Sequence, residues 1–114
     1  MEPLAAKKCK PCEGGTEPLP ASAAKTLLEA LRGWELVEGN AIRKTIVCKD
    51  FLGAVSVIQR IAPIAEAEDH HPDLHLTNYR RLTIELSTHA IGGLSENDFI
   101  LAAKIDQLLD ALPA

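Results

Sequence analysis

The chain has 114 residues, of which 46% are hydrophobic and 25% are charged. This length predicts one domain, and the composition is that of a globular chain, not of a collagen-like, coiled-coil or low-complexity one. The net charge of −4, with no dense run of Lys or Arg, argues against binding to the phosphates of nucleic acid. No apolar stretch approaches the roughly 20 residues that span a bilayer, and no signal-peptide core is found near the N-terminus. We therefore expect a cytoplasmic protein that binds neither nucleic acid nor a membrane.

Three cysteines, Cys9, Cys12 and Cys48, cannot all pair within one chain, which favours a reducing compartment. The Cys9-x-x-Cys12 spacing is that of half a zinc site. Neither a second cysteine pair nor a histidine pair at zinc-finger spacing accompanies it. The alternative is that both are solvent-exposed thiols of an N-terminal tail.

The first 21 residues contain four of the seven prolines and show neither helical nor strand periodicity. We interpret residues 1–21 as a flexible leader and residues 22–114 as the folded domain. Ser22 is placed to cap a short amphipathic helix over residues 23–32. Gly33 can end that helix because glycine readily adopts the left-handed conformation.

Alternating side chains predict a β-hairpin with strands at residues 34–38 and 41–47, joined by the turn dipeptide Gly39-Asn40. Asp50 then caps a long helix. Its apolar residues recur at steps of three and four: Phe51, Ala54, Val55, Ile58, Ile61, Ala62 and Ala65. Pro63 lacks the N–H that would bond to the carbonyl of Gln59, which predicts a kink over residues 59–63.

The sequence His70-His71-Pro72-Asp73 ends this helix, and residues 79–88 alternate as a half-buried strand does. A shorter strand is expected near residues 74–77. Ser95 caps a last helix, with Glu96 and Asp98 in its first turn, where carboxylates interact well with the helix dipole. The order αββαββα predicts an α+β fold in which helices cover one face of a four-stranded antiparallel sheet.

All four histidines, His70, His71, His75 and His89, fall within 20 residues of one another. Because an unperturbed imidazole titrates near pH 6.5, converging histidines offer both a proton donor and a proton acceptor at neutral pH. Two other interpretations stay open. The histidines end a helix and a strand without further function, or they bind zinc or iron together with carboxylates, although adjacent histidines do not easily point at one ion.

The spacing Glu66-x3-His70-His71-Pro72-x6-Tyr79-x9-His89-x8-Asp98 resembles the signature of the pterin-4a-carbinolamine dehydratases. Seven matched positions over 33 residues are more specific than one short motif. The similarity extends over about residues 22–110 and includes these landmarks: Gly33-Trp34, Lys49-Asp50-Phe51, Ser87-Thr88-His89, Gly93-Leu94-Ser95 and Asn97-Asp98. The resemblance implies a small α+β domain with a four-stranded antiparallel sheet packed against helices.

The resemblance also implies an activity. Family members dehydrate 4a-hydroxytetrahydrobiopterin to quinonoid dihydropterin without a metal or an organic cofactor, and so recycle the tetrahydrobiopterin of aromatic amino acid hydroxylases. A functional pairing with such a hydroxylase, and a homodimer or homotetramer, are implied. One alternative is an interaction module that joins a homeodomain transcription factor as a dimerisation cofactor, through the apolar stripe of residues 51–65. Another is a pterin- or molybdopterin-binding protein without turnover.

By this resemblance, His70 and His89 are the acid and the base, without a decision on which is which, and His71 binds and orients the substrate. The positions that match pterin contacts are Asp69, His70, His71, Ser87, Thr88 and His89.

Two carboxylates of the signature are expected to support these residues. Glu66 is placed to orient His70 across one helical turn, and Asp98 to accept hydrogen bonds from N-terminal amides of its helix. Tyr79 is expected to pack at the start of a strand, because its ordinary pKa near 10 suits proton transfer at neutral pH poorly. His75 lies outside the signature and is expected on the surface of a strand.

Three positions depart from the commoner family pattern. Many members carry Trp at position 74, where this chain has Leu74, and phenylalanines are frequent at Ile46 and Cys48. The stretch of residues 71–76 resembles a subgroup from plants, protists and some bacteria. An aromatic side chain beside a pterin strengthens stacking, so its absence leaves the affinity for the substrate and its identity open.

Overall fold

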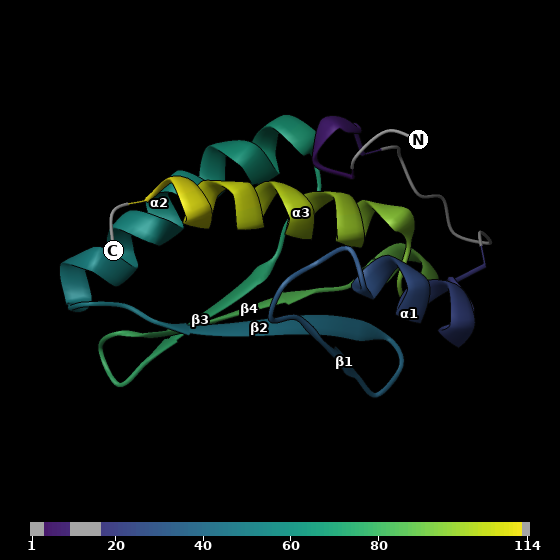
Figure 1. Cartoon of the computed structure of the whole chain (residues 1–114), viewed down its shortest axis with the longest axis horizontal. Helices are drawn as coiled ribbons and strands as arrows, with labels where there is room; N and C mark the ends of the chain where they lie inside the picture. The colour runs from purple at the N-terminus through teal and green to yellow at the C-terminus, as the bar shows by residue number, and fades with distance from the viewer. Residues whose placement is uncertain (1–3, 10–16, 113–114) are drawn as a thin grey trace.

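A four-stranded antiparallel sheet carries helices on one face in the computed structural model, which describes residues 4–9 and 17–112. The elements follow one another in this order: η1 (Leu4–Ala6), α1 (Ala21–Leu28), β1 (Glu35–Val37), β2 (Ala41–Val47), α2 (Phe51–Glu68), β3 (Asp73–Thr77), β4 (Arg81–Leu86), η2 (His89–Ile91) and α3 (Glu96–Ala111). The helices α1, α2 and α3 all lie on the same side of the sheet (Figure 1). The predicted α+β fold is confirmed. Within the described ranges, no helix is both long and apolar enough to cross a membrane.

The sheet is built from two tight hairpins, and its strand order is β1-β2-β4-β3. The first hairpin turns at Glu38 and Gly39, whose φ angles are 52° and 76°, and Asn40 closes the turn by donating to the carbonyl of Val37 at 3.1 Å. Two successive positive φ angles make the twist of the turn match that of the strands. The predicted position of the turn, at Gly39-Asn40, was therefore wrong by one residue.

The second hairpin turns at Asn78 and Tyr79, with φ angles of 51° and 53°. Tyr79 is 61% exposed and the Arg80 guanidinium lies 5.8 Å from its ring centre, while β4 begins only at Arg81. The prediction that Tyr79 packs at the start of a strand was wrong, because side-chain alternation does not show where a turn ends.

The long helix α2 begins as predicted, since the Asp50 carboxylate accepts a hydrogen bond from the N–H of Gly53 at 2.7 Å. Its buried face differs in part from the predicted stripe, because Phe51 is 52% exposed and Ala62 is also exposed. The fully or nearly buried positions are Ala54, Val57, Ile61 and Ala65. The helix continues through Pro63, which is exposed, and the kink expected over residues 59–63 stays a prediction.

The first helix starts earlier and is shorter than predicted. Pro20, not Ser22, occupies the N-cap position of α1, and no side chain caps this end. The helix stops at Leu28 because the next turn is closed by tighter bonds, including that from the N–H of Leu31 to the carbonyl of Leu28 at 3.0 Å. Gly33 follows this turn with a φ of 77°.

The described parts of the predicted leader are residues 4–9 and 17–21; contacts place both against the domain, and Ala21 already begins α1. Leu4 and Leu19 pack on the hydrophobic core, and the N–H of Leu19 donates to the carbonyl of Leu94 at 2.8 Å. Pro18 approaches Gly93 so closely that an added Cβ would lie 2.8 Å from the proline side chain. Cys12 lies outside the described residues, so the Cys9-x-x-Cys12 hypothesis stays a prediction.

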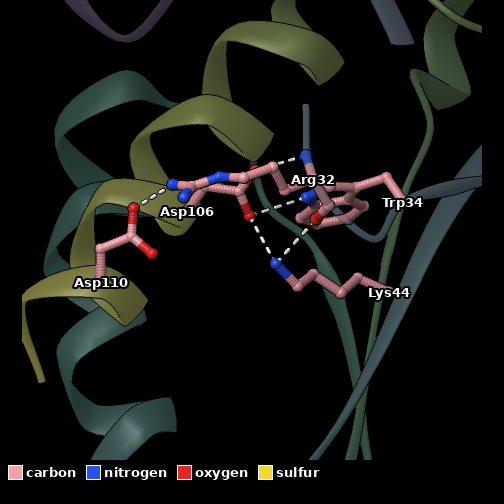
Figure 2. A network of polar contacts seen from close by, with 5 residues as sticks. All are labelled: Arg32, Trp34, Lys44, Asp106 and Asp110. Atoms are coloured by element: carbon pink, nitrogen blue, oxygen red, sulfur yellow. Dashed lines mark hydrogen bonds and ion pairs between the residues drawn. The ribbon is translucent and has the colours of Figure 1, made fainter. Parts of the chain in front are cut away.

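A buried carboxylate fixes α3 to the sheet (Figure 2). Asp106, whose side chain is only 8% exposed, accepts from Trp34 Nε1 at 2.9 Å and from Lys44 Nζ at 2.8 Å. Lys44 also donates to the carbonyl of Arg32, which pairs with Asp110 through its guanidinium. These bonds join the C-terminal half of α3 to β2 and to the segment before β1.

Candidate active site

A cavity of about 520 Å³ lies where the end of α2, the segment after β4 and the start of α3 meet. This volume falls in the range of small-molecule sites. Its lining residues are Cys9, Ala67, Glu68, Asp69, His70, His71, Ser87, Thr88, His89, Ala90 and Asn97. The structure therefore brings together around one cavity all six residues for which pterin contact was predicted.

The end of α2 separates the two adjacent histidines. Asp69 caps the helix in the left-handed conformation, with a φ of 50°. Aspartate tolerates this conformation better than most residues. The N–H of His70 then reaches back to the carbonyl of Ala65 at 3.2 Å, and the chain leaves the helix axis. As a result, His70 and His71 meet different carboxylates.

His70 pairs with Asp98, the third residue of α3. Its Nε2 atom lies 2.6 Å from Asp98 Oδ1, and the exposed fractions of the two side chains are 11% and 0%. The other carboxylate oxygen accepts from the Thr88 hydroxyl at 2.9 Å and from the N–H of Ser95 at 3.0 Å. Three charge-assisted hydrogen bonds compensate the loss of water around this carboxylate.

These contacts fix the positions of several protons. A carboxylate only accepts, so His70 Nε2 carries a proton, and Nδ1 is the ring nitrogen available for proton exchange with a ligand. The Thr88 hydroxyl donates its one hydrogen bond to Asp98. The Ser95 hydroxyl, 2.8 Å away, is therefore the donor in its contact with Thr88. The expectation that Asp98 accepts from an N-terminal amide is met at Ser95, and its contact with His70 comes in addition.

His71 pairs with Glu66, at 2.5 Å between Nε2 and Oε2. The prediction that Glu66 orients His70 was wrong. The left-handed turn at Asp69 directs His70 toward α3 and brings His71 back over the last turn of α2, next to Glu66. The exposed fractions of His71 and Glu66 are 55% and 75%, so this pair contributes little to stability.

His89 belongs to the same cavity lining and is the first residue of η2. The loop that carries it is closed on itself, since Thr88 and Gly93 form a bridge with hydrogen bonds of 2.8 and 3.4 Å. His89 itself is exposed. The loop therefore holds an imidazole that is in contact with water at the edge of the cavity.

Five lining residues were not predicted: Cys9, Ala67, Glu68, Ala90 and Asn97. Four of them are sequence neighbours of signature residues, which is the signal that could have identified them. Cys9 has no such signal, because it comes from a segment without periodicity. Its burial raises the pKa of its thiol to about 12. The hydrogen bond from its N–H lowers the pKa of Glu68.

His75 and Tyr79 do not reach the cavity. His75 is exposed on β3, opposite Thr83 of β4, which agrees with its expected place on the surface of a strand. In residues 4–9 and 17–112, no three His, Cys, Asp or Glu side chains are grouped as a metal site would require.

The fold and the site define a class of protein: a small α+β domain with a histidine-lined pocket suited to proton transfer on a small molecule. The chain belongs to the pterin 4 alpha carbinolamine dehydratase family, whose pattern matches residues 17–108. The resemblance found in the signature residues is thereby confirmed.

Relatives from distant organisms share most of this chain. A Nitrosomonas eutropha protein with the same family name is 48% identical over 107 residues, which cover 93% of each chain. Pterin-4-alpha-carbinolamine dehydratase 2, mitochondrial, from Arabidopsis thaliana is 45% identical over 92% of this chain and 58% of its own. A crystal structure of transcriptional coactivator/pterin dehydratase from Brucella melitensis has a TM-score of 0.74 and 34% identity, and the match covers 81% of this chain and 98% of that one.

Proposed function

We propose that this protein is a hydro-lyase that removes water from 4a-hydroxytetrahydrobiopterin, with His70 and His89 as the pair that transfers protons. Membership of the family and the names of the relatives support the reaction. The observation that carries the residue assignment is the contact of His70 with the fully buried Asp98, at 2.6 Å, in a cavity that His89 also lines.

The reaction breaks the carbon–oxygen bond at position 4a of the pterin. A proton must reach the departing hydroxyl, and a proton must leave a ring nitrogen, so the products are water and quinonoid dihydropterin. One group gives a proton and another takes one, and exchange with solvent restores both. Two imidazoles at neutral pH meet this requirement.

The surroundings of the two histidines favour different roles. His70 gains a positive charge when Nδ1 takes up a proton, and the Asp98 carboxylate compensates that charge, which suits His70 to the role of base. His89 is exposed and regains a proton from water directly, which suits it to the role of acid. His71, with Glu66, binds and orients the pterin at the edge of the cavity.

We assign the polar contacts to the pterin to Asp69 and Ser87, in addition to the histidines. The hydroxyl of Thr88 is engaged by Asp98 and Ser95, and its N–H donates to Gly93. We therefore assign Thr88 to the shape of the pocket through its methyl group and to the support of Asp98.

The test is the rate of dehydration of 4a-hydroxytetrahydrobiopterin, followed by stopped-flow absorbance. We expect His70→Ala and His89→Ala to lower kcat by about 10²–10⁴, the usual contribution of one acid or base. His75→Ala is the matched control, because it removes an exposed histidine of β3 that does not line the cavity. Each variant is checked for folding by circular dichroism, and the assay is repeated after treatment with a chelator.

The outcomes separate the functions. Equal rates for the wild type and both cavity variants would refute the assignment of the two histidines. A well-folded wild type that binds dihydrobiopterin but accelerates nothing would identify a pterin-binding protein without turnover. Coupling to tetrahydrobiopterin recycling is tested by adding the protein to an aromatic amino acid hydroxylase and following the return of its cofactor.

A second candidate function is protein interaction, and two observations favour it. Phe51 and Leu52, in the first turn of α2, are 52% and 77% exposed. The Brucella melitensis relative is described as a transcriptional coactivator as well as a dehydratase. The double variant Phe51→Ser, Leu52→Ser should lower the molar mass found by light scattering, from a homodimer or homotetramer, while dehydration persists. An unchanged mass would refute the involvement of this turn in assembly.

A further inference from the structure

Cys9 is part of the cavity lining, although it is almost 60 residues or more away in sequence from the rest of that lining. The N–H of Cys9 donates to Glu68 Oε1 at 2.8 Å, at the end of α2. The Cys9 thiol donates to the backbone carbonyl of Asn97 at 3.6 Å, at the start of α3. Cys9 therefore bridges the two helices that border the cavity.

Further contacts anchor the same segment, which we call the N-terminal strap (residues 4–9). Lys104 of α3 donates to the carbonyl of Ala5 at 2.8 Å and lies 3.7 Å from Glu68 Oε2. Lys7 pairs with Glu96 at 3.2 Å. Figure 1 shows η1, in purple, beside the C-terminal end of α2 and above α3.

The charged side chain of Glu68, beside the strap, has partners for both of its oxygens. Glu68, whose side chain is 8% exposed, accepts from Cys9 with one oxygen and faces Lys104 with the other. The hydrogen bond from Cys9 lowers the pKa of Glu68 and keeps the carboxylate ionised. The Cys9 thiol is neutral at physiological pH, because burial raises its pKa to about 12. A neutral thiol behaves as a small apolar group and can pack against the ring of a ligand.

We propose that Cys9 contacts the bound pterin and that Glu68 and Lys104 are positioning residues that hold it there. The N-terminal strap then determines how tightly the substrate is bound. This inference rests on the proposed function, because it takes the ligand of the cavity to be a pterin. It predicts effects on KM and on pterin affinity and none of similar size on kcat, because Cys9 has no part in the proton transfers.

The first test measures protection of the Cys9 thiol. In the Cys12→Ser, Cys48→Ser protein, alkylation by N-ethylmaleimide reports on Cys9 alone. Dihydrobiopterin at ten times its dissociation constant leaves about one site in eleven empty, so alkylation should slow about tenfold. The Cys9→Ser, Cys12→Ser protein is the matched control. Its Cys48 follows β2, beside Arg80 at the other end of β4, and should react at the same rate with and without dihydrobiopterin.

The second test fills the cavity. Cys9→Phe should raise KM about tenfold or more, as a misfitting pocket does, and leave kcat within about twofold. Cys48→Phe, a substitution of equal size outside the cavity, should change neither. Glu68→Gln should also raise KM. If Glu68 only stabilised the fold, its substitution would instead lower the folded fraction and kcat together.

The outcomes distinguish this inference from the proposed function. Binding of dihydrobiopterin, measured by fluorescence, without protection of Cys9 would overturn the inference and leave the dehydratase intact. An unchanged KM for a folded Cys9→Phe protein would do the same. If the wild type neither binds dihydrobiopterin nor accelerates dehydration, the proposed function fails, and the inference fails with it.

Discussion

The substitution Asp98→Asn tests the role of the buried carboxylate most sharply. The two oxygens of Asp98 have different partners: Oδ1 accepts from His70 at 2.6 Å, whereas Oδ2 accepts from Thr88 and from the N–H of Ser95. An asparagine must put its NH₂ group on one side or the other. On the Ser95 side it would face a backbone N–H that cannot change from donor to acceptor.

The NH₂ group is therefore expected on the His70 side. There it donates to Nε2 and drives the proton of the neutral imidazole to Nδ1, the nitrogen that must take up a proton from the pterin. Asp98→Asn should keep the helix cap but hold His70 in the wrong tautomer. The same change in the serine protease triad lowers kcat about 10⁴-fold through the tautomer. Here we expect a loss of about 10²–10⁴-fold.

The cost in stability should be smaller than for the alanine variant. Asp98→Asn keeps all three partners but makes each bond neutral, and this should cost about 1–3 kcal/mol. Asp98→Ala leaves several buried donors unpaired and opens a void, and should cost about 3–5 kcal/mol. Urea unfolding measures both values.

The assay combines kcat with long-range ¹H–¹⁵N NMR spectra of histidine, which show which ring nitrogen carries the proton. Wild-type kcat in a folded Asp98→Asn protein would refute the reasoning. So would a large loss of kcat with the proton of His70 still on Nε2, because the tautomer would then not be the cause.

Three other substitutions have expected outcomes of different kinds. Glu66→Gln should change KM less than about threefold, in initial-rate measurements, because exposed ion pairs are weak. Because the folded-state pKa of Glu68 is lowered, its contribution to stability is complete above the ordinary value of 4.5 and is lost as the pH falls through the folded value. Below pH 4.5, the urea midpoint of Glu68→Gln should therefore depend less on pH than the midpoint of the wild type. An equal pH dependence of the two midpoints would contradict the lowered pKa of Glu68. Trp34→Phe removes the bond to Asp106 and should lower the unfolding free energy by about 1–3 kcal/mol, with kcat unchanged. A loss of kcat in the folded variant would show that this contact affects the cavity.

Patterns that depend on one element alone were readable from the sequence. The alternation of Leu82, Ile84 and Leu86 predicted a strand with one buried face, and all three are fully buried. Asp50 predicted the start of α2, because the capping carboxylate and the N–H that donates to it are three residues apart. The histidines of the cavity were found because they share a signature with a family, and this signature does not depend on side-chain directions.

Contacts that depend on the path of the chain were not readable. Spacing on an ideal helix placed Glu66 next to His70, but the left-handed residue Asp69 ends the helix before that spacing applies. The contact of His70 with Asp98 joins residues 28 positions apart. Cys9 was missed because the strap has no periodicity, and its position is decided by charges on α2 and α3.

The cavity is assembled from four separate stretches of the chain: the N-terminal strap, the end of α2, the segment after β4 and the start of α3. No single stretch supplies the whole lining, so an unfolded chain does not present the assembled cavity to a ligand. Occupancy and folding are therefore thermodynamically linked, and ligand at 100 times its dissociation constant adds about 2.7 kcal/mol to stability. Domains of this size are commonly stable by only about 5–15 kcal/mol. The lifetime of this protein against unfolding and proteolysis should consequently rise and fall with the concentration of its own substrate.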